Sequence, residues 1–374
     1  LTTVDTATYW SPFGQAVIAA GIVVGGLGVM TLASILGFAV SRHLGLTQRM
    51  LATQETGTGA MGQISLLLKA VIATSLTMQA LLAAVFLPRF LSMGIDPVRA
   101  VWDAVFMAIS VFNNAGFVIL PEGLSPHVTD WWMLIPIILG TTVGAIGFPV
   151  IMDVAKNLRA PRRWRLHTKL TLSTYLILAF VGALALALTE WNNPATLGAI
   201  DTPSKILNAM LAGVNSRSSG LSALDVGAMQ TQTHFVQDIL MMIGGGSAST
   251  AGGVKVTTFA VLVLAVIAEA RGDRDIETFG RRIPTSAVRL AVAVSLLGLA
   301  LVAVSVVLLL SMTHYSLDII LFETASAFAT VGLSTGITPV LPVGAKYVLI
   351  FLMFAGRTGS MTVAAALALR ERSR

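Results

Sequence analysis

The chain has 374 residues, of which 55% are hydrophobic and only 11% are charged, and its mean hydropathy is +0.82. Soluble domains contain about 25% charged residues, so this composition excludes a soluble globular protein and indicates many membrane spans. The lack of cysteine excludes disulfides and thiolate metal sites. The net charge of +6 is better explained by cytoplasmic loops than by nucleic-acid binding.

Apolar segments along the chain predict membrane-spanning helices, because about 20 such residues cross a hydrocarbon core of ~30 Å. They lie at 14–40, 64–87, 131–155, 168–189, 236–268, 286–311 and 346–369. Three other helical segments are too short to span a bilayer and are predicted to be re-entrant. These segments lie at 99–112, 203–215 and 318–330.

Lysine and arginine predict the orientation of the chain. Basic segments follow 14–40, 131–155 and 236–268, and the chain ends with "RERSR", whereas the intervening connections contain few basic residues. The positive-inside rule therefore predicts cytoplasmic basic loops and a cytoplasmic C-terminus, with the re-entrant segments entering from outside. The basic run 159–167 is interpreted either as a topology-determining loop or as a contact for anionic lipid headgroups or a cytoplasmic partner.

Each re-entrant segment is followed by a glycine loop: "VFNNAGFVI" (111–119), "VNSRSSGLS" (214–222) and "ATVGLSTG" (329–336). Gly220 follows Gly116 by 104 residues, and Gly332 follows Gly220 by 112 residues. One interval earlier, the chain begins with "LTT", which is similar to "LST" after Gly332. We therefore expect four repeats, the first lacking its opening half, over residues 1–55, 56–160, 161–280 and 281–374.

The predicted fold is an all-α membrane protein of four helix–pore-helix–glycine-loop–helix units in a pseudo-fourfold arrangement. Backbone that is not helical at membrane depth is tolerated where it lines a watery path. There, carbonyl groups can replace the hydration shell of a cation, and the negative C-terminal ends of the pore helices favour one. Any one loop is equally well explained as a surface loop or a close helix contact, but the recurrence favours a cation filter. The predicted filter residues are Asn114, Ala115, Gly116, Ser218, Ser219, Gly220, Thr330, Val331 and Gly332.

The stretch "GGGSASTAGG" interrupts the apolar segment 236–268 with small residues only. A phosphate-binding loop, close packing of helices through small residues, and an unwound gate below the filter are three interpretations of it. The first lacks the Gly-Lys-Ser/Thr ending and a preceding strand. The candidate gate residues are Gly244, Gly245, Gly246, Ser247, Ala248, Ser249, Thr250, Ala251, Gly252 and Gly253, with Lys255 at the end of the segment.

Two arginines lie at unexpected depths. Arg357 falls inside the last apolar segment, either reaching the cytoplasmic surface or facing the path and pairing with the gate segment. Arg217 lies in the glycine loop 214–222 and is expected to brace carbonyls from behind, paired with an acidic residue such as Asp225, Asp5 or Glu323. Acidic residues toward the outer side are expected to form a rim that attracts cations or is simply solvated. They are Asp5, Asp103, Glu122, Asp225 and Glu323.

The stretches "SVFNNAGF", "SRSSGLS", "TVGLSTG" and "IGGGSASTAGGVK" resemble the Trk/Ktr/HKT potassium-transporter superfamily. The segment "FAGRTGSMTV" most resembles its bacterial KtrB branch. The resemblance implies K⁺ transport in a bacterial plasma membrane, with Na⁺ as a further candidate ion and no organic cofactor in this chain. It also implies a homodimer gated by a cytoplasmic nucleotide-binding ring of KtrA-like RCK subunits, with membrane lipids as the surroundings.

The resemblance places Gly116, Gly220 and Gly332 at the filter glycines, and 244–253, Lys255 and Arg357 at the gate. The first filter glycine would fall before Leu1, so the K⁺/Na⁺ preference is only partly readable. A secondary transporter with broken helices and a midplane site is an alternative, although it predicts inverted repeats. An intramembrane enzyme is a weaker one, because every histidine lies in a loop or near the end of a span.

Overall fold

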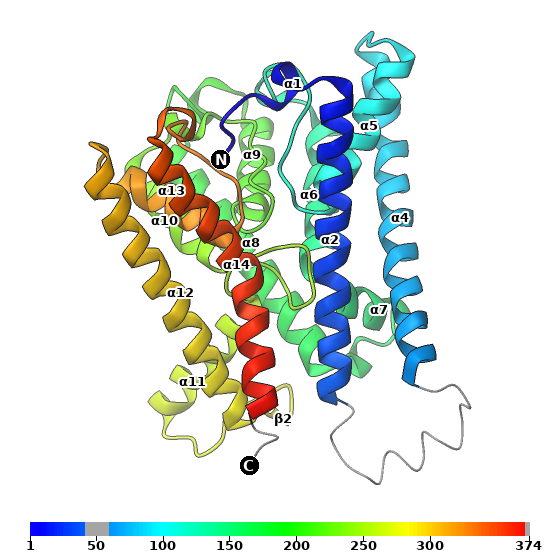
Figure 1. Ribbon diagram of the computed structural model, residues 1–374, viewed down its shortest axis with the longest axis vertical. Coiled ribbons are helices and arrows are strands. Elements are labelled where there is room, and N and C mark those ends of the chain that lie inside the picture. The colour runs from blue at the N-terminus through cyan, green and yellow to red at the C-terminus, as the bar shows by residue number, and fades with distance from the viewer. Residues whose placement is uncertain (42–59, 371–374) are drawn as a thin grey trace.

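The protein is almost entirely helical (Figure 1). The computed structural model describes the backbone of residues 1–41 and 60–370, and side chains over 1–28, 31 and 68–358. Long helices are joined by short helices and by a small hairpin. The longer helices are α2 (Pro12–Ser41), α4 (Ala60–Ser92), α5 (Pro97–Phe112), α6 (Trp131–Ile146), α7 (Phe148–Lys156), α8 (Leu166–Glu190), α9 (Thr202–Asn215), α10 (Thr231–Met242), α11 (Val256–Arg271), α12 (Thr285–Met312), α13 (Leu317–Ala329) and α14 (Val343–Arg370).

The remaining elements are short. They are α1 (Thr6–Tyr9), the 3-10 helices η1 (Ser125–His127), η2 (Pro161–Arg163), η3 (Leu197–Ala199), η4 (Val226–Ala228) and η5 (Thr338–Val340), and the antiparallel strands β1 (Glu277–Thr278) and β2 (Arg281–Arg282). Helices occur in every region where hydrophobicity predicted them, although the expected helix over 131–155 is divided into α6 and α7. The segments 99–112, 203–215 and 318–330 correspond to α5, α9 and α13, and the stretch 236–268 is interrupted between α10 and α11.

Several helices have the length and composition of membrane spans. Within the described residues, Leu68–Ser92, Leu166–Glu190 and Thr285–Met312 each qualify alone. Large apolar side chains of α8, such as Leu176, Phe180 and Leu188, are exposed on its outer face. In water such a face would be unfavourable, so it indicates contact with lipid.

The prediction of one continuous helix over 131–155 was wrong, because the chain bends by 97° between α6 and α7. Gly147 stands at the bend with φ +90° and ψ 153°, a conformation that only glycine adopts readily. Pro149 follows in the first turn of α7, where it lacks an N–H to continue the α6 hydrogen-bond ladder. A glycine followed two positions later by a proline is a sequence signal for a bend, but a reading based on hydrophobicity alone does not detect it.

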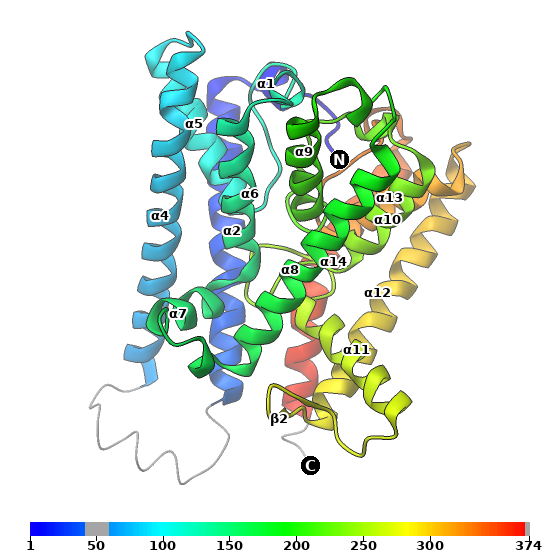
Figure 2. The same ribbon diagram turned by 180° about the vertical axis from the view of Figure 1, so that it is seen from behind.

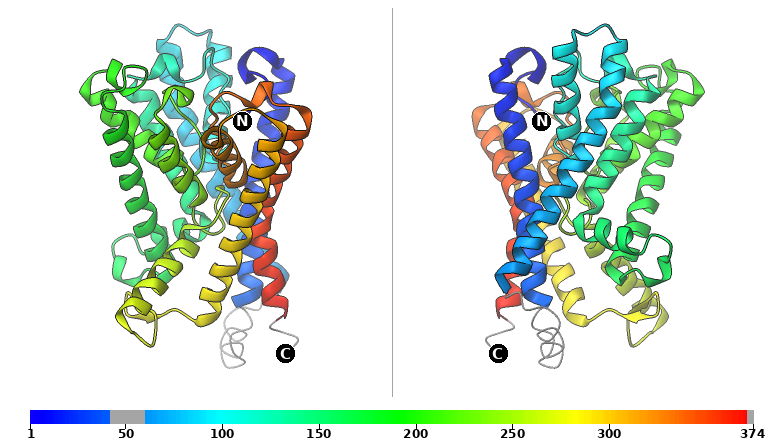
Figure 3. Two further views of the ribbon diagram at one scale, coloured as in Figure 1. Left: turned by 90° about the vertical axis from the view of Figure 1, so that its left-hand side faces the viewer. Right: turned by 90° about the vertical axis from the view of Figure 1, so that its right-hand side faces the viewer.

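The helices pack as successive groups that follow one another around the molecule (Figures 2 and 3). Each short helix packs along a long neighbour, α5 on α4, α9 on α8 and α13 on α14. Contacts between groups join α2 to α5, α6 to α9 and α10 to α13, and α14 contacts α2. These contacts therefore connect the helix groups in a closed circuit, from α2 around to α14 and back to α2.

The two ends of the helix bundle differ in charge. α1 and the α4–α5 connection lie at one end, which we call the upper end, and the last turn of α14 and β2 lie at the opposite, lower end (Figure 1). The basic loop between α7 and α8 and the hairpin with Arg281 and Arg282 are also at the lower end (Figure 2). The predicted basic segment after 14–40, the 55/56 repeat boundary and the last four residues lie outside the described residues.

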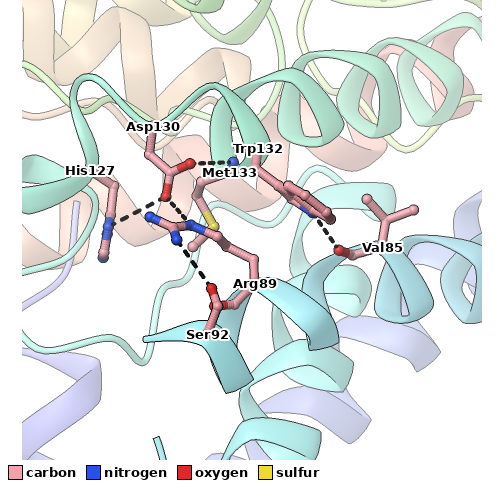
Figure 4. Close-up of polar contacts among 7 residues, drawn as sticks. All are labelled: Val85, Arg89, Ser92, His127, Asp130, Trp132 and Met133. Carbon is pink, nitrogen blue, oxygen red and sulfur yellow. Dashed lines mark hydrogen bonds and ion pairs between the residues drawn. The ribbon is translucent and has the colours of Figure 1, made fainter. Parts of the chain in front are cut away.

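A polar network fastens α4 to the start of α6 at the upper end (Figure 4). The Arg89 guanidinium Nε donates to Asp130 Oδ2 at 2.7 Å, and Asp130 also caps α6 by accepting from the Met133 N–H at 3.1 Å. Trp132 Nε1 donates to the Val85 carbonyl at 2.9 Å, and His127 Nδ1 lies 3.9 Å from Asp130 Oδ2. Burial lowers the pKa of His127, with Asp130 opposing and Arg89 adding to the effect, so this side chain is held as the neutral imidazole.

Candidate functional site

Three glycine turns end the short helices α5, α9 and α13 in a similar way. They contain Gly116, Gly220 and Gly332, and we call them the second, third and fourth turns after the expected repeats in which they lie. The Ala115 N–H donates to the Ser110 carbonyl at 2.9 Å, and the Val331 N–H donates to the Ser326 carbonyl at 3.0 Å. In the third turn the donor of the equivalent bond is the glycine itself: the Gly220 N–H donates to the Asn215 carbonyl at 3.0 Å. The second and fourth turns are thus closely alike, and the third differs by one residue.

Left-handed backbone marks the same places in two of these turns. Asn114 and Thr330 have φ values of +53° and +52°, each two residues before a glycine, Gly116 or Gly332, with φ of +74° or +99°. Residues other than glycine adopt such angles rarely, and the surrounding structure must hold them there. The turns are therefore built shapes rather than loose loops.

The three turns meet one another. A methyl group on Gly116 would overlap the carbonyl oxygen of Ser219, and one on Gly220 would overlap the carbonyl oxygen of Val331. The carbonyl oxygen of Ser219 also lies 3.9 Å from the Cβ position of Gly332. The structure therefore brings together the three predicted filter segments, which are more than 100 residues apart in the chain.

The junction is exposed on one side and buried on the other. Gly332 is exposed and Gly116 and Gly220 are half-buried, whereas Ser218 and Ser219 are fully buried. Among the described residues, the carbonyl oxygens of Ser219 and Val331 accept no backbone hydrogen bond. Such free carbonyl groups, at the negative C-terminal ends of helices, are suited to a dehydrated cation.

The predicted gate segment, residues 244–253, is an unwound and largely buried loop between α10 and α11. Its base is closed by a backbone bridge between Ile243 and Val254. It is also bonded to the bend between α6 and α7: the Gly246 N–H donates to the Ala145 carbonyl at 2.7 Å, and the Phe148 N–H to the Ala248 carbonyl at 3.4 Å. The backbone groups freed by the break between α6 and α7 therefore pair with those freed between α10 and α11, which satisfies N–H and carbonyl groups that would otherwise lack hydrogen bonds.

The segment 244–253 lies directly against the glycine turns. A methyl group on Gly252 would overlap the Thr330 hydroxyl, so only glycine permits this approach. Arg357, which is half-buried on α14, donates from Nη1 to the Thr250 carbonyl. Arg357 therefore contacts the segment 244–253 through the Thr250 carbonyl. Lys255 Nζ donates back to the Ala251 carbonyl at 2.6 Å.

The expected ion pair of Arg217 was wrong. Its guanidinium carbon lies 3.9 Å from the centre of the Tyr175 ring, Nε donates to the Gly213 carbonyl at 3.4 Å, and the side chain is fully buried. The acidic candidates are used elsewhere: Asp5 and Asp225 bond to nearby backbone or hydroxyl groups, and Glu323 bonds to the fourth loop. A delocalised guanidinium stacked on an aromatic face is a known way to bury this charge.

Glu323 has a role that the sequence did not reveal, since it was expected at an outer rim, attracting cations or solvated, or as a partner of Arg217. It is fully buried on α13 and accepts hydrogen bonds from the Ser334 hydroxyl at 2.7 Å and the Thr335 N–H at 2.8 Å on Oε1. The Thr335 hydroxyl also donates to Oε1, and the Thr338 hydroxyl donates to Oε2 at 2.8 Å. This carboxylate therefore fixes the loop that follows Gly332. In the sequence, the hydroxyl residues within 334–338 were the signal that could have indicated a buried acceptor nearby.

The glycines of the long helices are a second feature that the sequence analysis missed. A methyl group on Gly144 of α6 would overlap the Phe112 carbonyl, and one on Gly356 of α14 would overlap the Phe328 carbonyl. These two glycines let α6 and α14 approach the last turns of α5 and α13. Small residues commonly permit such close helix contacts in membranes.

Comparison with known proteins identifies the family. The family model described as a cation transport protein, TrkH, matches residues 1–373. The chain belongs to this family. Within the TrkH family, it is 37% identical over 373 residues to the Ktr system potassium uptake protein B of Bacillus subtilis, covering 100% of this chain and 83% of that protein. The Trk/Ktr resemblance and its KtrB-like character are thus confirmed.

Two further relatives agree with this assignment. The potassium/sodium uptake protein NtpJ of Enterococcus hirae is 32% identical, with 97% of this chain and 81% of that protein covered. The crystal structure of the potassium transporter TrkH from Vibrio parahaemolyticus superposes with a TM-score of 0.73 at 17% identity, covering 98% of this chain and 74% of that chain. This TrkH-family chain therefore shares the TrkH fold, and its relatives are named as cation transporters rather than enzymes.

Proposed function

We propose that this chain is the membrane subunit of a K⁺ uptake system and that K⁺ crosses through a path between the glycine turns. The observation that carries this proposal is the meeting of Gly116, Gly220 and the Ser219 and Val331 carbonyls at one open junction. The names of the relatives, which include potassium uptake proteins, support K⁺ as the cargo. The name of the relative NtpJ, a potassium/sodium uptake protein, also makes Na⁺ a candidate as a transported or coupling ion.

The proposed filter consists of Asn114–Gly116, Ser218–Gly220 and Thr330–Gly332, arranged around a pseudo-fourfold axis. The contacts that join α2 to α5, α6 to α9, α10 to α13 and α14 to α2 support a closed ring of four units. The Leu1 N–H lies 2.9 Å from the Gly332 carbonyl, so the chain start is beside the fourth turn. This position supports assigning the first residues to the first repeat, next to the fourth in the ring.

The proposed gate is the segment 244–253 with Lys255 and Arg357. It lies against the turns at Thr330 and is bonded to Arg357 from α14, an arrangement that would obstruct ions leaving the filter. A positive guanidinium beside the path would also repel cations. Displacement of this segment would then open the path.

We further propose a bacterial plasma-membrane location, with the lower end in the cytoplasm. The arginines of the hairpin and of the α7–α8 loop at that end support this orientation. The Ktr-system names of the relatives imply further subunits, and we propose a homodimer regulated by a cytoplasmic nucleotide-binding ring.

Ion uptake into liposomes tests this function. The purified chain should take up radioactive Rb⁺, and unlabelled K⁺ should compete better than Na⁺. Failure to transport Rb⁺ in the presence or absence of Na⁺ would overturn the proposal.

A secondary transporter remains the alternative, because the breaks at α6–α7 and α10–α11 are also features of that class. It predicts that uptake requires a second, stoichiometrically coupled solute, which the same liposomes would reveal.

A further inference from the structure

Thr250 occupies a junction between three parts of the molecule. It lies in the middle of the 244–253 segment and is fully buried. Its hydroxyl accepts a hydrogen bond from Asn114 Nδ2 at 2.6 Å and lies 3.4 Å from the Phe112 carbonyl oxygen. Its backbone N–H donates to the Gly144 carbonyl at 3.3 Å, and its carbonyl accepts from Arg357. One residue thus joins the second glycine turn, α6 and α14.

The Asn114 side chain depends on this contact. It is 5% exposed, and its Oδ1 atom has no hydrogen-bond partner within the described residues. The bond from Nδ2 to Thr250 therefore fixes the orientation of the amide. Asn114 is also the left-handed residue of its turn, two positions before Gly116, and such a conformation persists only when its surroundings hold it.

The same segment touches the matching position in the fourth turn. Thr330 is the left-handed residue two positions before Gly332, and its hydroxyl is the group that a side chain at Gly252 would strike. The Cβ position of Gly253 lies 3.4 Å from Ala329 Cα. The segment therefore contacts equivalent residues of two turns. The Thr250 hydroxyl contacts Asn114, and the backbone of Gly252 contacts Thr330.

We propose that Thr250 is a positioning residue that sets the shape of the second glycine turn, so that displacement of the 244–253 segment alters ion selection as well as flux. This inference rests on the proposed function. If the segment moves away, Asn114 loses its Nδ2 partner while Thr330 loses its packing against Gly252. Both left-handed residues would then be released together, next to Gly116 and Gly332.

Thr250→Val tests the proposal, because it removes the hydroxyl and keeps the side-chain shape. We expect the ratio of Rb⁺ to Na⁺ uptake in liposomes to fall about fivefold, the change that corresponds to one neutral hydrogen bond. Thr250→Ser retains the hydroxyl and should restore the ratio. Thr257→Val is the matched control, since Thr257 lies in the first turn of α11 and its hydroxyl pairs with Ser247 Oγ at 3.2 Å rather than with a residue of a glycine turn.

Asn114→Gly removes the same bond from its other end while allowing the left-handed backbone. It should reproduce the loss of selectivity, and combining it with Thr250→Val should cause no further loss. A wild-type Rb⁺/Na⁺ ratio in both single variants, or fully additive losses in the double variant, would overturn the inference. Equal Rb⁺ and Na⁺ uptake by the unmodified protein would instead contradict the proposed function.

Discussion

Replacing Glu323 by alanine removes the carboxylate that accepts four hydrogen bonds from the loop after Gly332. Four donors lose their partner: the Ser334 hydroxyl, the Thr335 N–H and hydroxyl, and the Thr338 hydroxyl. Bonds to a charged group contribute about 1.5–3 kcal/mol each, but these four share one side chain and do not add. With the cavity left by the truncation, we expect Glu323→Ala to lower the free energy of unfolding by roughly 3–5 kcal/mol.

Glu323→Gln is the informative comparison. Its carbonyl oxygen can keep the three bonds now made by Oε1, and the Thr338 hydroxyl can rotate to accept from the new amide. The expected loss is therefore only about 1–2 kcal/mol. Thr338→Val, which deletes the single donor to Oε2, should cost a similar amount.

Chemical unfolding of the detergent-solubilised protein measures these differences, and Rb⁺/Na⁺ competition in liposomes measures the effect on the fourth turn. We expect Glu323→Ala to reduce selectivity for Rb⁺ together with stability, and Glu323→Gln to keep most of both. If Glu323→Ala were as stable and as selective as the unmodified protein, the assignment of Glu323 as the support of this turn would be refuted.

Three other predictions follow from the described contacts. Arg357→Ala removes a charge-assisted bond to the gate segment, worth about 1.5–3 kcal/mol, and should raise Rb⁺ flux severalfold; unchanged or reduced flux would indicate a structural role. Arg217→Lys loses planar stacking on Tyr175 and should lower stability by about 2 kcal/mol in thermal unfolding, with no added effect in a Tyr175→Leu background. Burial depresses the pKa of His127 in the folded protein, so the unfolded state binds more protons below pH about 6.5. The melting temperature should therefore fall on acidification below that pH, and less so in His127→Gln, whereas identical acid sensitivity would argue against a buried neutral imidazole.

Hydrophobicity and glycine spacing predicted most of the fold because membrane spans and re-entrant segments have lengths set by the bilayer. The helices α5, α9 and α13 and the interruption before Val256 appear where the sequence placed them. The bend at Gly147 was missed, since both of its arms are as apolar as one continuous span. Its physical cause, a positive φ followed by Pro149, depends on backbone angles rather than on composition.

The candidate site was predicted in part. The three glycine turns and the contact of Arg357 with 244–253 were expected, because repeats and a charge at membrane depth are visible in sequence. The partners of buried polar groups were not. Arg217 stacks on Tyr175 instead of pairing with an acid, Glu323 bonds to the loop that follows its own helix, and Thr250 bonds to Asn114, 136 residues away. Such pairings depend on packing in three dimensions, which a single sequence does not specify.

The central claim is that the meeting glycine turns select the ion, and Gly332→Ser against Gly336→Ser tests it most directly. The two glycines are exposed, lie in the same loop and have φ of +99° and +94°, so the backbone strain of serine is matched. Only Gly332 faces another turn, at Ser219, whereas nothing lies within 4 Å of the Cβ position of Gly336. In liposomes, Gly332→Ser should lose most of the preference for Rb⁺ over Na⁺ while Gly336→Ser keeps it. An unchanged preference in both variants, or an equal loss in both, would contradict the account.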